Sequence, residues 1–121
     1  MVLVDTSVWI RFLSGRAPYA DQLDRLLSLG EAVGHELVYG ELLIGDHGGR
    51  RKALASFERI LQAKTVSHRE VVAFVRARDL QGRGVGWIDV HLLASAVVGR
   101  LQLWTADIGL SQVADWEEAR L

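Results

Sequence analysis

The sequence contains no cysteine, which excludes disulfide bonds and thiolate metal sites. It has one proline, and no apolar run approaches the roughly 18 residues that a membrane helix needs. Neither sign of charge dominates, because 14 Lys and Arg residues face 15 Asp and Glu residues. The chain therefore lacks the basic character of a general nucleic-acid coat protein. Any contact with such a polymer must come from a local patch, for which Arg11 with Arg16, or residues 50–52, are candidates.

Length and composition are those of one globular domain. The chain has 121 residues, of which 50% are hydrophobic and 24% charged, so we expect a single domain over residues 1–121 with one core. The apolar start is too short, and lacks the basic flank, for a signal peptide. With the absence of cysteine, this indicates a cytoplasmic protein that does not enter the membrane.

Short apolar segments alternate along the chain with segments of helical periodicity. We expect strands at Val2–Val4, Ala32–Val33, 63–66 and 101–105. We expect helices after Asp5, from near Pro18, at Glu36–Ile44, through Leu54 to Leu61, through Val71 to Val75, at 87–98 and after Asp107. This alternation predicts an α/β fold, a three-layer α/β/α sandwich around a short parallel sheet.

A set of acidic residues stands in or beside apolar segments, at Asp5, Glu41, Asp89 and Asp107. Asp5 and Asp107 follow the first and last expected strands, and open α/β sheets bind ligands at the carboxyl ends of their strands. Clustered carboxylates repel one another and are costly to bury unless a cation neutralises them. Ligands that are all oxygen favour Mg²⁺ or Mn²⁺ over zinc.

Each of these residues also has a purely structural explanation. Asp5, Asp89 and Asp107 stand near the starts of expected helices, where Asp is a favoured N-cap. Glu41 is equally compatible with a solvated position on its helix. The neighbouring hydroxyl residues Thr6, Ser7 and Thr105 are typical of turns. Taken one at a time, the residues leave both interpretations open.

Taken together, the segments around these acids resemble a known family. The segments are DTSVWI at 5–10, VYGELLIG at 38–45, WIDVHLLASA at 87–96 and LWTAD at 103–107. In order, approximate spacing and total length they are similar to VapC-type PIN domains, the toxins of VapBC toxin–antitoxin pairs. The resemblance covers essentially the whole chain. Two features depart from it: the tail at 116–121 does not present the extra strand of many relatives, and Ala106 stands where relatives often carry a basic or polar residue.

The resemblance implies hydrolysis of RNA phosphodiester bonds. Asp5, Asp89 and Asp107 would hold one or two Mg²⁺ or Mn²⁺ ions, and Glu41 would ligate an ion or orient the attacking water. Ser7 and Thr105 would aim the carboxylates or contact phosphate.

The resemblance also implies partners. These are an RNA substrate, a VapB-type antitoxin whose C-terminal segment lies across the acidic groove, and a second copy of the chain in a homodimer. Apolar residues of the first two helices would receive the antitoxin, unless they belong to the core: Val8, Trp9, Phe12, Leu13, Leu23, Leu26 and Leu27.

Other interpretations fit less well. A phospho-receiver domain needs an acidic pair after the first strand and a late lysine, but Asp5 is single and the only lysines are Lys52 and Lys64. A haloacid-dehalogenase-like phosphatase needs Asp-x-Asp after the first strand, which Asp5-Thr6-Ser7 does not supply. A catalytically inactive PIN fold that serves as a binding module remains an alternative, although all four acids are present.

Overall fold

A short parallel sheet forms the middle of three layers. The computed structural model describes residues 1–117 and 119. Its strands are β1 (Val2–Val4), β2 (Ala32–Val33) and β3 (Gln102–Trp104), arranged in the order β2-β1-β3. Both pairings of β1 are parallel, with Leu3 opposite Val33 on one side and opposite Leu103 on the other. The expected α/β/α sandwich is confirmed.

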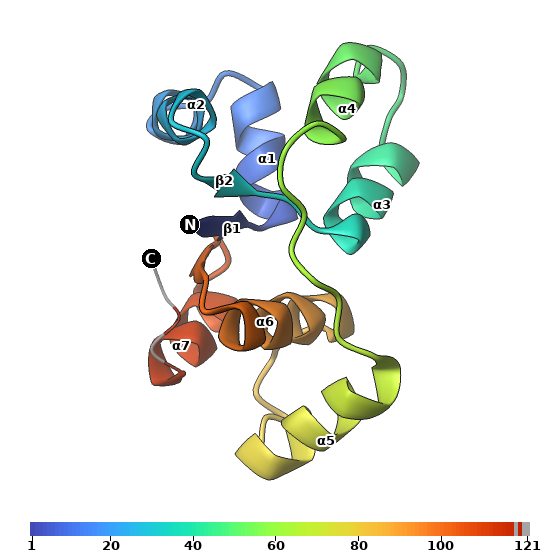
Figure 1. Ribbon diagram of the computed structural model, residues 1–121, viewed down its shortest axis with the longest axis vertical. Helices are drawn as coiled ribbons and strands as arrows, with labels where there is room; N and C mark the ends of the chain where they lie inside the picture. The colour runs from blue at the N-terminus through green and yellow to red at the C-terminus, as the bar shows by residue number, and fades with distance from the viewer. Residues whose placement is uncertain (118, 120–121) are drawn as a thin grey trace.

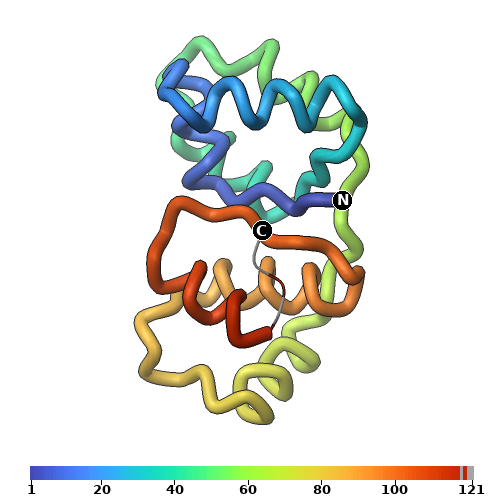
Figure 2. Tube along the Cα trace, turned by 90° about the vertical axis from the view of Figure 1, so that its left-hand side faces the viewer, coloured from blue at the N-terminus to red at the C-terminus, as the bar shows by residue number. Residues whose placement is uncertain are grey.

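Helices cover both faces of the sheet (Figures 1 and 2). The helices on one side are α1 (Thr6–Leu13), α2 (Tyr19–Ser28), α3 (Glu36–Ile44) and α4 (Arg51–Phe57). The helices on the other side are α5 (His68–Arg78), α6 (Trp87–Gly99) and α7 (Ile108–Trp116). None of the helices described is long and apolar enough to cross a membrane.

The buried position of β1 explains its unbroken run of apolar residues. All three of its side chains are buried, as expected for a central parallel strand with a helical layer on each face. Helix α6 lies between the sheet and α5 and is buried at every position from Leu92 to Ala96 (Figure 1). Asp5, directly after β1, therefore emerges from the centre of the core at the carboxyl edge of the sheet.

The strand predicted at residues 63–66 is wrong. The residue before this segment, Gln62, forms only an isolated bridge with Gly34, the residue after β2. Gly34 donates to the Leu61 carbonyl at 2.8 Å, and the Gly34 carbonyl accepts from the Ala63 amide at 2.8 Å. Because β2 has already ended at Val33 and α3 begins at Glu36, no further edge is left for this segment to pair with.

The helix predicted to continue through Leu61 ends earlier, because α4 stops at Phe57. The side-chain amide of Gln62 donates to the carbonyls of Phe57 and Ile60 at 3.2 and 3.3 Å. These bonds satisfy carbonyls that a longer helix would otherwise use. The chain is thereby freed to turn toward Gly34.

The C-terminal tail at 116–121 lies partly outside the described residues. Among those described, the carbonyl of Ala119 accepts a hydrogen bond from the Leu103 amide at 2.6 Å. Leu103 is the middle residue of β3, so this contact covers part of the outer edge of the sheet.

Candidate active site

Asp5 is the centre of a hydrogen-bonded turn at the carboxyl end of β1. It is only 4% exposed and occupies the N-cap position of α1, but its side chain caps nothing. Instead, its Oδ2 accepts from the Ser7 hydroxyl at 2.7 Å and from the Thr105 hydroxyl at 2.8 Å. Its Oδ1 accepts no hydrogen bond from the described residues and is not among their buried, unpartnered atoms. One carboxylate oxygen is therefore held in place while the other stays open.

The same two hydroxyl groups tie the end of β3 to this turn. The Ser7 hydroxyl accepts from the Ala106 amide at 3.0 Å, and the Thr105 hydroxyl accepts from the Asp107 amide at 3.0 Å. Each hydroxyl thus donates to Asp5 and accepts from a backbone amide of the loop after β3. This reciprocal pattern holds the turns after the two neighbouring strands together.

Asp107 is exposed and is a genuine N-cap, because its Oδ1 accepts from the Leu110 amide at 2.9 Å. A Cβ at Gly109 would lie 3.3 Å from that Oδ1 and 3.5 Å from the carbonyl of Gly84. A glycine here lets the loop before α6 approach the first turn of α7. The loop before α6, whose first turn carries Asp89, therefore lies close to the start of α7 behind Asp107.

Glu41 reaches the site from the middle of α3. The hydroxyl of Thr6 donates to its Oε1 at 2.6 Å, which joins α3 to the first residue of α1. From the sequence, Thr6 was open to two interpretations, a turn hydroxyl or a group of the site, because nothing local connects positions 6 and 41. This contact is the functional detail that the sequence could not supply.

Asp89 lies in the first turn of α6, where its Oδ2 accepts from the Gly86 amide at 3.3 Å. The pKa of this carboxyl is raised to about 6, and burial is the largest cause. The negative charge of Asp5, and more weakly those of Asp107 and Glu41, contribute to this upward shift, while the hydrogen bond from the Gly86 amide opposes it. The four acids therefore share one electrostatic environment, although Asp89 and Asp107 also bond to the starts of their helices.

Residues 1–117 and 119 contain no group of three or more His, Asp or Glu side chains positioned together to hold a metal ion. An ion would have to draw these carboxylates closer. The donor set nevertheless fits a hard divalent cation, since every candidate ligand is a carboxylate oxygen. Asp5 presents an open oxygen, and the mutual repulsion around Asp89 is what a cation relieves.

The comparisons with known proteins agree with this geometry. Residues 2–115 match the PIN domain family, and the chain belongs to it. The chain is also similar to a curated protein named Ribonuclease VapC32, found in the CDC 1551 and H37Rv strains of Mycobacterium tuberculosis. Against each it is 45% identical over 108 residues, which cover 88% of this chain and 85% of the relative.

Proposed function

We propose that this protein is a Mg²⁺- or Mn²⁺-dependent endoribonuclease and the toxin of a toxin–antitoxin pair. The observation that supports this most directly is the Asp5 carboxylate, whose Oδ2 is fixed by two hydroxyls while Oδ1 stays open, and whose charge acts on Asp89 together with those of Asp107 and Glu41. A structural carboxylate would be expected to use both oxygens within the fold. The family and the ribonuclease relative supply the class of reaction. With an RNA substrate and an antitoxin partner, the proposed site of action is the cytoplasm.

In this proposal Asp5, Asp89 and Asp107 hold the cation. When bound, the cation supplies an activated water and neutralises charge on the phosphodiester. Ser7 and Thr105 keep the Asp5 carboxylate in one orientation, which limits the reorganisation that binding requires. Glu41 has one oxygen bonded to Thr6, so its other oxygen is available to ligate the ion or orient the attacking water.

Removal of the metal tests the proposal. Purified, partner-free protein incubated with a mixed pool of structured RNAs should cleave them with Mg²⁺ or Mn²⁺ and should stop in EDTA. Adding excess metal back should restore cleavage, because the carboxylates cannot activate water alone. If folded protein leaves every RNA intact at saturating metal, an inactive PIN fold that serves as a binding module becomes the better description.

An apolar hollow near α1 and α4 is a candidate surface for the antitoxin. It has a volume of about 340 Å³ and is lined by Trp9, Phe12, Leu27, Ala53, Ser56, Phe57 and Ile60. The buried Trp9 Nε1 is the one buried side-chain nitrogen or oxygen of the described residues without a hydrogen-bond partner. We propose that an apolar antitoxin segment fills this hollow. Val8 and Leu23 are fully buried core residues and take no part, contrary to the broader surface expected from the sequence.

Blocking this hollow should release the enzyme from its antitoxin. Ser56 is exposed at its rim, and Ser56→Arg should weaken antitoxin binding at least about tenfold by steric exclusion, a loss of about 1.4 kcal/mol. Ala55→Arg is the matched control, because Ala55 is exposed on the same helix but does not line the hollow. Titration of cleavage with cognate antitoxin measures both. Equal inhibition of the two variants would contradict this docking site.

A second copy of the chain is proposed to cover α3. This helix is mostly apolar apart from Glu36 and Glu41, and it exposes 52% of Leu43 and 89% of Ile44. Large apolar side chains that are exposed side by side on a helix often pack against a partner. Light scattering should therefore give twice the chain mass of 13.4 kDa, and Ile44→Asp should return the monomer. A wild-type monomer at high concentration would contradict the dimer.

A further inference from the structure

Two aromatic rings stack beside the acidic edge of the sheet. Tyr19 begins α2 and Trp104 ends β3, and their ring centroids lie 6.1 Å apart with planes inclined by 23°. Both side chains are half-buried. Trp104 directly precedes Thr105, whose hydroxyl bonds to Asp5. The pair is therefore fixed at the border of the candidate active site.

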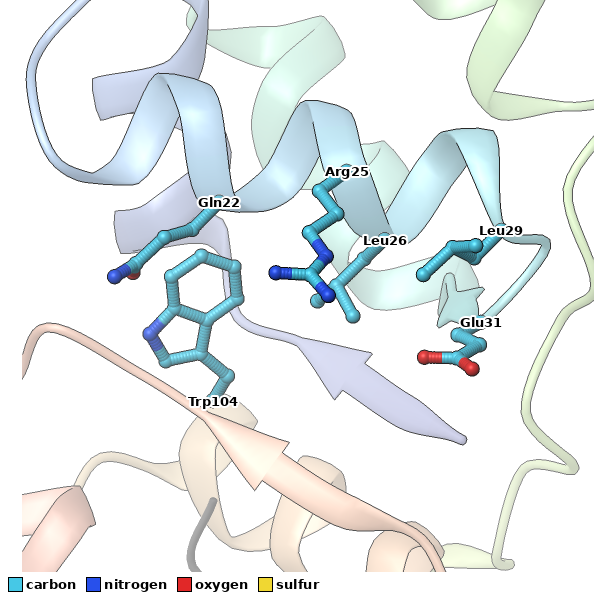
Figure 3. Close-up of a pocket in the computed structure, with 6 residues that line it drawn as sticks. All are labelled: Gln22, Arg25, Leu26, Leu29, Glu31 and Trp104. Carbon is cyan, nitrogen blue, oxygen red and sulfur yellow. The ribbon is translucent and has the colours of Figure 1, made fainter.

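A hollow opens on each side of this aromatic pair. The first, of about 290 Å³, includes Tyr19, Thr105 and Asp107 in its lining. The second, of about 470 Å³, is lined by Gln22, Arg25, Leu26, Leu29, Glu31 and Trp104. Figure 3 shows Gln22 and Arg25 extending from α2 toward the Trp104 indole. One ring of the stacked pair thus lines each hollow, with Asp107 in the lining of the first and Arg25 in the lining of the second.

Cationic groups accompany the rings. The Arg11 guanidinium lies over the Tyr19 ring at 5.3 Å and donates to the Ser7 carbonyl at 2.9 Å. Arg25 is exposed, and within the described part of the chain the salt bridges do not include it. At the far end of the second hollow, Glu31 offers a hydrogen-bond acceptor (Figure 3). The hollow thus combines an aromatic face, a cation and polar groups.

We propose that this second hollow, the Trp104 pocket, binds a nucleobase of single-stranded RNA next to the nucleotide at the carboxylates. The base stacks on Trp104, Arg25 contacts its phosphate, and Gln22 and Glu31 meet its edge. Every base offers a face for stacking, and aromatic rings with arginines are the usual elements of single-strand binding. The proposal rests on the ribonuclease function proposed above and adds how its substrate is held. With a net charge of −1, the chain has no overall attraction for RNA, so such a local contact matters.

Binding of a fluorescently labelled, unstructured RNA oligonucleotide tests the pocket. The affinity is measured by fluorescence anisotropy in the presence of Mg²⁺, and every protein carries Asp5→Asn so that the RNA is not cleaved. Adding Trp104→Ala should weaken binding roughly tenfold, and Trp104→Phe should restore most of it. Arg25→Gln should reduce the slope of log affinity against log salt by about 0.7, the value for one phosphate contact on a single strand. Trp116→Ala is the control, because Trp116 is 59% exposed on α7, which does not line this pocket.

The outcomes separate this inference from the proposed function. Suppose that wild-type protein cleaves RNA, but the RNA affinity of the Asp5→Asn protein is unchanged by adding any of the pocket substitutions (Trp104→Phe, Trp104→Ala in folded protein, and Arg25→Gln). The proposed base-binding role of the Trp104 pocket is then wrong, and the nuclease function stands. The same conclusion follows if these variants weaken binding of the antitoxin but not binding of RNA. If the pocket variants behave as expected but wild-type protein never cleaves, the nuclease is wrong and the RNA site stands. Absence of both binding and cleavage overturns both. In the active protein, Trp104→Ala should raise KM and leave kcat nearly unchanged.

Discussion

Replacing Asp5 with asparagine is expected to lower the rate of RNA cleavage by roughly a thousandfold or more, a barrier increase of about 4 kcal/mol. The reason lies in how its two oxygens are used. Oδ2 accepts from two hydroxyls, so the asparagine oxygen will take that position. The amide NH₂ must then occupy the open Oδ1 position. A hydrogen-bond donor would face the cation there, and one negative charge would be lost.

The substitution should leave the fold nearly unchanged, because the two side chains have the same shape and the hydroxyl contacts persist. Single-turnover cleavage at saturating Mg²⁺ measures the loss, and urea unfolding checks the fold. Asp115→Asn is the matched control, because Asp115 is an exposed carboxylate on α7 without a contact to the site. Activity of Asp5→Asn within tenfold of wild type would mean that the carboxylate is structural, or that the active site lies elsewhere.

Replacing His35 with alanine is expected to destabilise the protein by about 3 to 5 kcal/mol. His35 is completely buried at the N-cap of α3. Its Nδ1 accepts from the Leu37 amide at 3.1 Å, and its Nε2 lies 3.1 Å from the Ser95 hydroxyl on α6. Both contacts are satisfied by a neutral ring with its hydrogen on Nε2. Alanine removes the cap, leaves the Ser95 hydroxyl unpaired and opens a cavity.

The same residue makes stability depend on pH. Burial lowers the pKa of His35, and the charge of His91 lowers it further, while Glu36 acts in the opposite direction. Between this lowered pKa and the ordinary value of about 6.5, the unfolded chain binds a proton that the folded protein does not. The stability that depends on neutral His35 is therefore fully present above about pH 6.5. It is lost progressively as the pH falls from 6.5 toward the lowered pKa of the folded protein. His35→Ala should lose this part of the pH dependence.

Urea denaturation at pH 5.5 and pH 7.5 measures both effects. His47→Ala serves as the control, because His47 is exposed in the loop after α3. A cost below about 1 kcal/mol for His35→Ala would contradict the role assigned to the buried contacts. Because His35 caps the helix that carries Glu41, the variant should also lose activity, and lowering the temperature should recover part of it.

Much of the fold follows from local patterns in the sequence. Val2–Val4 is a strand because an unbroken apolar run suits a strand buried on both faces. Glu36–Ile44 ends where Gly45 follows, as expected. The prediction at 63–66 failed because pairing depends on how far the neighbouring strand extends. That length is decided by where the chain turns into α3, and residues 63–66 carry no information about it.

The sequence by itself determined the α/β class, the strand after which Asp5 emerges and the helices that carry Glu41 and Asp89. These follow from periodicity and from the chemistry of acids beside apolar runs, which are properties of neighbouring residues. Only the tertiary structure decided which oxygens are occupied, that Thr6 bonds to Glu41, and that Tyr19 stacks on Trp104. Such pairs join residues separated by 35 positions in the first case and more in the second. Packing of whole helices on the sheet brings them together, and no local pattern encodes that contact.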